Sequence, residues 1–542
     1  MFKTKKVFQV NFAIISFMII VSSAPMFSFA QSAQLPSSEK IINDYLKAGG
    51  GKKRLAAVKN AVYDWKVTRS VGGGGNLQNA GRAQTLFQNP SLLRFDLPDK
   101  EINVVNAATF TTTATNGNTT WRRGATGGVQ TLTDEESKAF RLQAMLAATK
   151  LTDLKNQRVA AQVVGRQIVG GEAAYIVEFA VRNGARLRYF FGADSKLPVR
   201  IENPAVRYSA CLSDYRPTAD GIFEAHRVIE PCLENDQASD FSTFELEKVA
   251  YDTNLSPAVF DPPPTLENFD LAALVEELKK NEESMLERVS EYSFVQKETE
   301  RAFDGKGGIK KETTKTYEVF PTRQGRRILK LVSENGIPLV GEKLSREEQR
   351  VVKEIEKSEA EYARKQEKSV AGQKVETEVG ENVNASEGGL EQQAILTILR
   401  VSEVYSPRFE SFRDREAIVF NFRPRAGYKP RGFFDAVFSK LAGTVWIDKE
   451  DRQIVRAETR VVENVKMGGG LMATFRKDST IVFERAKFGE VWLPKSSQDN
   501  ASAKFLLFGS LDAATITEYS DYNRYSTEVK DYKVDDLDKP KQ

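Results

Sequence analysis

The sequence predicts a mainly β, α+β protein with two similar halves, and three observations predict it. Apolar and polar residues alternate at a period of two along many short segments, which is the pattern of half-buried strands. The turn dipeptides Asn116-Gly117 and Asn183-Gly184 stand between such segments, and a two-residue type I′ hairpin turn needs the positive φ that these residues tolerate. Segments 189–202 and 445–458 also share one arrangement, an apolar–aromatic strand, an acidic turn and a strand that ends in Glu.

Local signals place the helices of the first half. Ser37 or Ser38 can cap a short helix that ends at the glycine run 49–51, because a serine oxygen accepts first-turn amides and glycine tolerates the conformation that follows a helix. Thr133 opens the capping-box sequence Thr-Asp-Glu-Glu of a helix that extends to about Ala148. The alternating segments around these helices predict antiparallel strands.

A proline run divides the chain. The consecutive prolines 262–264 continue neither a helix nor a central strand, and apolar residues at helical spacing begin again at Leu271. We therefore expect one domain at 31–264 and a second at 265–533, each long enough to fold alone. A polar tail, residues 534–542, follows.

The second domain contains a charged insertion at 342–390. Residues 342–369 hold eight Glu and eight Lys or Arg, and pairs such as Glu342 and Arg346 at i,i+4 favour an exposed helix. Residues 370–389 are rich in Gly, Glu, Asn and Ser, a composition typical of disordered chain. We expect the insertion to be helical first and disordered after that.

The first thirty residues have the features of a cleaved secretory signal. Three lysines precede the apolar run 12–21, and the small residues Ser28 and Ala30 define a cleavage site after Ala30. An uncleaved anchor is the alternative, but the run is much shorter than the roughly 20 residues that span a membrane. Cleavage takes three lysines from a net charge of +4, and 4 − 3 = +1. We expect a soluble periplasmic or secreted protein without electrostatic attraction to nucleic acid.

Export makes a disulfide between Cys211 and Cys232 possible. The two cysteines flank the turn-like segment 216–221. Strands that leave this turn in antiparallel fashion bring the cysteines within bonding range. Two buried free thiols are the alternative.

The composition argues against the common catalytic and metal-binding arrangements. His226 is the one histidine in the chain, which disfavours histidine metal centres, Ser-His-Asp triads and Cys-His dyads. The glycine runs 49–51 and 72–75 lack the flanking residues or the following helix of a phosphate-binding loop. With 74 acidic residues, spacing selects no pair of catalytic carboxylates. We therefore expect no enzyme, no cofactor and no metal site.

Aromatic and aliphatic stripes on the predicted strands are the remaining candidates for a site. The side chains of each stripe lie on one face of their strand, so the stripes can together form one concave surface. An ordinary sheet core has the same pattern. A curved open sheet that helices cover can leave room there for a lipid chain. The candidate cavity residues are Tyr63, Trp65, Val67, Leu93, Phe95, Leu97, Tyr175, Val177 and Phe179 in the first half, and Phe420, Phe422, Trp446 and Trp492 in the second.

Several segments together carry a resemblance to a known family. They are the helix end 45–50, Trp65, Asn116-Gly117 with Trp121, 189–191 with 197–200, 214–217 with 220–222, 260–262, 441–448 and 491–494. With these segments the chain resembles exported proteins of the outer-membrane lipoprotein carrier (LolA-like) superfamily, over most of residues 35–530. The resemblance implies two tandem incomplete antiparallel β-barrels, each wrapped around a few helices, and a hydrophobic cavity that holds acyl chains.

The function that this resemblance implies is that of a lipid- or lipoprotein-binding, carrier-like protein. Its partner would be a lipid or an acylated protein, and its contact with a membrane would be transient. The carriers have a single domain and are much shorter, so the tandem copies and the insertion 342–390 depart from their pattern. The alternative is a sensor or scaffold without catalytic activity that binds an envelope protein through 342–390. Neither function involves nucleic acid.

Overall fold

The computed structural model describes residues 35–70, 77–98, 110–124, 127–182, 184–232, 240–289, 291–303, 309–322, 327–370, 395–467, 473–505 and 509–524. The predicted signal sequence 1–30, residues 371–390 of the insertion and the polar tail lie outside these residues.

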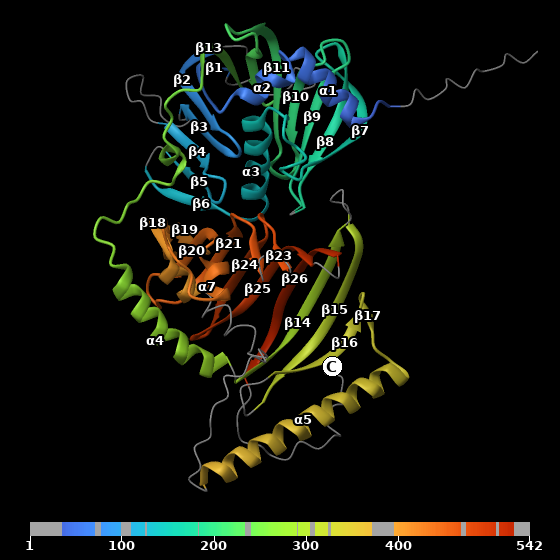
Figure 1. The fold of residues 1–542 in the computed structure, drawn as a ribbon, viewed down its shortest axis with the longest axis vertical. Coiled ribbons are helices and arrows are strands. Elements are labelled where there is room, and N and C mark those ends of the chain that lie inside the picture. Colours follow the sequence, from blue (N-terminus) through green and yellow to red (C-terminus); the bar gives the residue numbers. More distant parts are fainter. Residues whose placement is uncertain are drawn as a thin grey trace, which may run out of the picture. The chain divides into compact units, whose positions relative to one another are not determined.

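The strands from residue 60 to residue 251 form one antiparallel sheet, which we call sheet A (Figure 1). Its spatial order is β6-β5-β4-β3-β2-β1-β13-β12-β11-β10-β9-β8-β7. The end strands β6 and β7 do not pair with each other, so the sheet is not closed into a barrel. The bounds are β1 (Asn60–Ser70), β2 (Leu77–Gln88), β3 (Leu92–Pro98), β4 (Phe110–Thr115), β5 (Thr120–Arg123), β6 (Val129–Leu132), β7 (Ala160–Val169), β8 (Glu172–Ala180), β9 (Arg186–Gly192), β10 (Pro198–Asn203), β11 (Tyr208–Pro217), β12 (Phe223–Glu230) and β13 (Phe241–Tyr251).

The strands of the second half form sheet B, which is also antiparallel and open. Its order is β17-β16-β15-β14-β26-β25-β24-β21-β20-β19-β18, and β23, which pairs with β22, joins at β25. The bounds are β14 (Tyr292–Phe303), β15 (Ile309–Pro321), β16 (Arg327–Glu334), β17 (Ile337–Pro338), β18 (Ser402–Phe412), β19 (Arg415–Pro424), β20 (Leu441–Asp448), β21 (Ile454–Val461), β22 (Val465–Met467), β23 (Ala473–Phe475), β24 (Thr480–Phe488), β25 (Val491–Phe505) and β26 (Gly509–Arg524).

The two sheets share one strand order. In each sheet the first strand pairs with the last, β1 with β13 and β14 with β26. The order then runs backward along the chain on one side, to β7 or β18, and forward on the other, to β6 or β17. The two similar segments take matching places, since 189–202 lies in β9 and β10 and 445–458 lies in β20 and β21.

The helices begin and end close to the predicted positions. The side chain of Ser37 caps the first helix by accepting the N–H of Lys40. The capping box at Thr133 does not form, because Asp134 has a φ of 54° and the hydroxyl of Thr133 donates to the carboxylate of Asp134 instead. The helices are α1 (Ser38–Ala48), α2 (Lys52–Ala57), α3 (Asp134–Thr149), α4 (Leu271–Val289), α5 (Gly341–Val370) and α7 (Phe433–Phe438), with helical residues at 395–401 and 3-10 turns η1 (Pro204–Val206) and η2 (Pro257–Phe260).

Both predicted hairpins form, but both have longer connections than the two-residue turns that the sequence predicts. Strand β8 ends at Ala180 and β9 begins at Arg186. Strands β8 and β9 pair around Gly184, whose φ is 93°; Asn183 lies outside the described residues. Residues 116–119 connect β4 and β5. The loop is wider than a two-residue turn because Asn116 Oδ1 accepts the N–H groups of Asn118 and Thr119, which is an Asx turn.

Sheets A and B contact each other through their end strands β6 and β18, within the unit formed by residues 37–542. The carboxylate of Glu410 accepts the N–H of Thr131 at 2.7 Å and its hydroxyl at 2.6 Å. Arg408 donates to Glu410 and to the Thr131 hydroxyl, each at 2.6 Å. The last strand of sheet A ends at Tyr251 and the first strand of sheet B begins at Tyr292, so these bonds cross the division predicted between 31–264 and 265–533. Independent folding of the two halves stays a prediction.

Candidate functional site

One face of sheet A and its helices enclose a continuous layer of buried apolar side chains, which we call the apolar layer. Helix α3 contributes Leu142 and Leu146, which are buried, and α1 contributes Ile41 and Leu46. Figure 1 shows α3 lying against sheet A, where it contacts β2, β3, β4, β5 and β9. In the part of the chain that the structure describes, α1, α2, α3 and the segment 151–159 cover this face of the sheet.

Most of the candidate residues of the first half line this apolar layer. Tyr63, Leu93, Val177 and Phe179 are buried members of it, whereas Trp65, Phe95 and Tyr175 are partly buried against it. Val67 and Leu97 belong to a neighbouring cluster, with Ala83 and Phe244, that shares Trp65 with the layer. The register of β1 shifts between Asp64 and Trp65 and again after Val67. Such bulges redirect side chains, so the stripe on β1 does not keep strictly to one cluster.

Small and aromatic side chains join Leu142 and Leu146 in the contact between α3 and the sheet. Phe140 of α3 meets Phe95 of β3 edge to face, with 5.7 Å between ring centroids. Ala139, Ala144 and Ala148 are buried on the same helix and present a single methyl group each. The helix therefore meets the sheet with apolar side chains of mixed size.

A buried polar cluster lies at the end of α3. Lys150, the residue that caps the helix, donates to Glu224 of β12 at 2.7 Å and to the hydroxyl oxygen of Tyr63 at 3.0 Å. Glu224 also accepts the hydroxyl groups of Tyr63 and Tyr251, at 2.9 and 2.5 Å. The Lys150 ammonium lies over the ring of Phe87, 5.2 Å from its centroid. This cluster, the Lys150 cage, connects the end of α3 to β1, β12 and β13.

The Lys150 cage keeps its tyrosines protonated. Burial raises the pKa of Tyr63 well above its ordinary value, and the Glu224 carboxylate raises it further. The pKa of Tyr251 is raised for the same two reasons. Protonated tyrosines can donate to a carboxylate, so the cage retains its hydrogen bonds throughout the neutral pH range.

In sheet B, Phe420 and Phe422 are buried on the face that helices cover. Leu274 and Leu278 of α4 pack against them, together with Ile395, Ile398 and Leu399 of the helical residues 395–401. This face of sheet B corresponds to the covered face of sheet A.

Trp446 and Trp492 lie in a different cluster. Val419 pairs with Trp446 across β19 and β20, whereas Phe420 pairs with Val445. Directly paired residues share a face and successive residues alternate, so Trp446 lies on the face opposite to Phe420. The four candidates of the second half therefore do not pave one surface, which corrects the expectation from the sequence.

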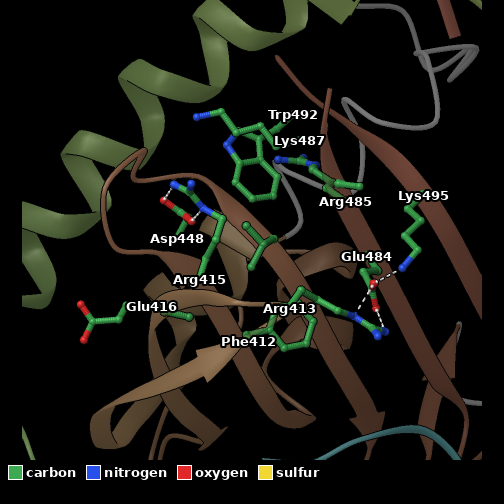
Figure 2. A pocket seen from close by; sticks show the side chains of 13 residues that line it. Phe412, Arg413, Arg415, Glu416, Asp448, Glu484, Arg485, Lys487, Trp492 and Lys495 are labelled. Carbon is green, nitrogen blue, oxygen red and sulfur yellow. Dashed lines mark hydrogen bonds and ion pairs between the residues drawn. The ribbon is translucent and has the colours of Figure 1, made fainter. Parts of the chain in front are cut away.

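On the Trp446 side, sheet B has a hollow of about 280 Å³ (Figure 2). Basic side chains outnumber acidic ones around it, and aromatic rings form part of its wall. Its lining residues are Phe412, Arg413, Arg415, Glu416, Ala417, Asp448, Val455, Glu484, Arg485, Ala486, Lys487, Trp492 and Lys495.

The comparisons with known proteins add structural neighbours. No family model and no curated protein matches the sequence. A DUF1329 family protein from Desulfovibrio piger has 14% sequence identity, with 41% of this chain and 97% of its own covered at a TM-score of 0.28. A LolA superfamily protein from Nitrosomonas europaea has 10% identity, with 42% and 98% covered at 0.29. The MucA/MucB complex from Pseudomonas aeruginosa has 7% identity, with 90% and 99% covered at 0.17.

Two further observations concern the described part of the chain. None of its helices combines the length and the apolar character that crossing a membrane requires. It also contains no group of three His, Cys, Asp or Glu side chains that could hold a metal ion.

Neither the Lys150 cage nor the basic lining of the hollow is predictable from the sequence. Lys150 and Glu224 stand 74 positions apart in the chain, and neither belongs to a motif. The basic residues of the hollow come from β19, β24, β25 and the turn after β18, so only the pairing of these strands brings them together.

Proposed function

We propose that the chain is an exported, non-catalytic binding protein, formed by two tandem LolA-like half-barrels, that holds an acyl chain in the apolar layer of sheet A. The observation that carries this proposal is the continuous apolar face of an open sheet, against which α1, α2 and α3 pack. The common strand order of sheets A and B supports the tandem copies. The Cys211–Cys232 disulfide, which is present, supports an oxidising compartment.

Burial of methylene groups supplies the binding energy. Each buried CH₂ contributes about 0.8 kcal/mol, so eight to ten of them contribute roughly 6–8 kcal/mol. Loss of translational freedom offsets part of this sum, which leaves affinities in the micromolar range without a charged anchor. An acyl chain can therefore bind to this layer through apolar contacts alone.

Helix α3 is the element that must move when an acyl chain enters. Polar bonds hold both of its ends. Arg122 of β5 pairs with Glu136 in the first turn at 2.7 Å, and the Lys150 cage holds the last turn. Between these ends Ala139, Ala144 and Ala148 are buried beside Leu142 and Leu146, so displacement of the helix exposes both small and large apolar side chains.

Substitution of Phe95 tests the site. Phe95 is half-buried and contacts α3 through Phe140, so Phe95→Glu should weaken a fluorescent long-chain fatty acid at least tenfold, since a carboxylate in the layer opposes burial of the chain. Phe223→Glu is the matched control, because Phe223 is exposed on β12 of the same sheet. Both variants should retain a cooperative thermal melt.

Two results would contradict the proposal. One is a wild-type protein that binds no fatty acid and carries no extractable lipid after purification. The other is a Phe95→Glu variant that melts normally and binds as tightly as the Phe223→Glu variant.

The role of α3 is tested by measuring how fast the protein takes up a fatty acid. Arg122→Gln removes the bond to Glu136 and should accelerate fatty-acid uptake in stopped-flow fluorescence. Arg301→Gln is the control, because Arg301 forms a similarly exposed pair with Glu312 in sheet B. Equal uptake rates in the two variants would show that α3 does not control entry.

The second candidate function, a scaffold, rests on α5. Val351 of α5 is buried, but Val352 and Ile355 are 41% and 40% exposed, so this helix has apolar surface for a protein partner. Deletion of residues 342–390 should abolish such a complex in a pull-down from envelope extract and leave fatty-acid binding unchanged. A complex that survives the deletion would exclude α5 as the contact.

A further inference from the structure

We propose that the hollow on sheet B binds a small anionic amphiphile, a carboxylate or phosphate head on a short apolar chain or ring. The apolar part of the wall comes from Phe412, Ala417, Val455 and Trp492. Trp446 is fully buried beside it, with 5.9 Å between its ring centroid and that of Phe412. The wall therefore offers aromatic contact to one end of a ligand, and the charged residues around it meet the other end.

The three carboxylates of the lining are already committed to partners. Glu484 is held by Arg413 and Lys495 at 3.2 and 2.9 Å, and also by Arg456. Asp448 accepts both Nε and Nη2 of Arg415, at 2.5 and 2.9 Å. The third, Glu416, pairs with Lys449 at 2.8 Å, and Figure 2 shows it pointing away from the other lining side chains.

Three of the basic residues, Arg413, Lys487 and Lys495, retain donors by contrast. Arg413 uses its Nε and Nη2 on Glu484, and a guanidinium has five N–H groups. In the part of the chain that the structure describes, Lys495 and Lys487 each donate one hydrogen bond, to Glu484 and Asp451, and an ammonium has three protons. The side chains of Arg413 and Lys495 are 56% and 46% exposed, so both can turn toward a ligand.

The sum of charges favours an anion. Five basic residues, Arg413, Arg415, Arg485, Lys487 and Lys495, line the hollow against three acidic ones. Burial raises the pKa of Glu484, but Lys495, Arg456 and Arg413 together hold it below its ordinary value. Glu484 therefore stays ionised and paired with these three basic side chains, and it takes no proton from the head group of the ligand.

The volume limits the ligand to a short one. Sites for drug-sized molecules enclose about 300–1,000 Å³, and this hollow, at about 280 Å³, is slightly smaller than that range. It occupies sheet B, whereas the acyl chain of the proposed function lies in sheet A. The two sites can therefore be tested separately.

Calorimetric titration of the full chain with octanoate, octyl phosphate and octanol tests the inference. Both anions should bind at least tenfold more tightly than octanol, and salt should weaken them, because the rim charges are exposed and screened. The better of the two anions identifies the head group. The double variant Arg413→Gln/Lys495→Gln should reduce the affinity of that anion about tenfold, a loss of about 1.4 kcal/mol.

Lys440→Gln provides the matched control, because Lys440 is also a partly exposed lysine paired with one glutamate, Glu463, and neither residue lines the hollow. It should bind the anions like the wild type, and the thermal melts should verify that both variants fold. Equal affinity for octanol and octanoate, or equal affinity of the double variant and the control, would overturn the inference. Octanoate binding that responds to Phe95→Glu but not to the double variant would also overturn it and leave the proposed function standing.

Discussion

At the scale of single residues, a buried charge needs a complete set of hydrogen-bond partners. Arg408 is fully buried, and its guanidinium donates to the carboxylate of Glu410, the carbonyl of Ser406, the amide oxygen of Asn421 and the hydroxyl of Thr131. Burial lowers the pKa of Arg408, and Glu410 opposes this shift. The complete set of acceptors makes an ionised arginine tolerable there.

Removal of this cation should be costly. Arg408→Met leaves Glu410 buried without its partner, and we expect a loss of about 3–5 kcal/mol in the free energy of unfolding. Urea denaturation measures it. Arg423→Met is the control, since Arg423 pairs with Glu403 at the surface and such a pair contributes about 0–1 kcal/mol. Equal losses in the two variants would show that Arg408 is not a buried charge.

The buried tyrosines of sheet A make the protein sensitive to alkali. Burial and Glu224 raise the pKa of Tyr63, and burial, followed by neighbouring acids and tyrosines, raises those of Tyr208 and Tyr215. In the unfolded chain a tyrosine releases its proton near pH 10. Above that pH the unfolded state binds fewer protons than the folded state, so stability falls as pH rises.

We therefore expect the melting temperature to decrease steeply between about pH 9 and pH 11. Tyr63→Phe should show a shallower decrease, because one contributing group is absent. Thermal melts of the two proteins across this pH range provide the measurement. An identical slope in both proteins would exclude Tyr63 as a source of the effect.

Single positions were predictable where a strand pattern determined them. Val177 and Phe179 are buried, as their period-two spacing predicts. Lys150 was not predictable, because a lysine after a helix is normally solvated and only the fold brings Glu224 and Tyr63 to it. The positions of buried polar groups depend on contacts between distant strands, and a sequence pattern does not encode these contacts.

At the scale of elements, the hairpin β11–β12 depends on the disulfide. Cys211 lies in β11 and Cys232 follows β12, and the bond between them is formed as the sequence predicts. The cysteines are separated by 21 positions, and closing a loop of this size contributes about 3 kcal/mol in the chain-entropy model.

The double variant Cys211→Ser/Cys232→Ser should lose about this 3 kcal/mol in urea denaturation, chiefly because its unfolded chain gains freedom. Addition of a reductant should destabilise the wild type and leave the variant unchanged. A wild type that reacts with a thiol reagent after denaturation without reductant would contradict the bond.

The extent of helix α5 was predicted from the sequence, but its contacts were not. The charge pairs predicted a helix over 342–369, and the structure has one at Gly341–Val370. The helix is not solvated on all sides, because Glu347 accepts the N–H of Leu331 of β16 at 2.7 Å and Val351 is buried. A charge pattern indicates that a helix can face water, but it does not reveal which strand the other face meets.

At the scale of the whole molecule, bonds between sheets A and B oppose separation of the halves. We expect residues 31–264 and 265–533, expressed separately, to melt cooperatively but at lower temperatures than in the full chain. Separation breaks the bonds of Thr131 to Glu410 and opens the buried pair of Glu410 with Arg408 to water. Calorimetry of the fragments and of the full chain measures the difference.

Two outcomes would contradict this expectation. Fragments without a cooperative melt would show that the predicted division is wrong. Fragments that melt at the temperatures of the full chain would show that the bonds between the sheets contribute nothing.

The open antiparallel architecture was predictable, because alternation and turns are local signals that repeat many times. The resemblance between 189–202 and 445–458 also pointed to equivalent strands, which the shared sheet order places at matching positions. The contact through β6 and β18 was not predictable. Glu410 and Thr131 are 279 positions apart, and nothing in either strand identifies the other.

The pairing of the first strand with the last has a kinetic consequence. Ala61 pairs with Tyr251 and Tyr292 pairs with Arg524, so the partners lie 251 − 61 = 190 and 524 − 292 = 232 positions apart. Closing such long loops precedes the gain from pairing, and folding rates fall as contacts become less local. During synthesis the central pair of sheet A must wait for residue 251. The central pair of sheet B must wait for residue 524, so it forms only when all but the last 542 − 524 = 18 residues have been made.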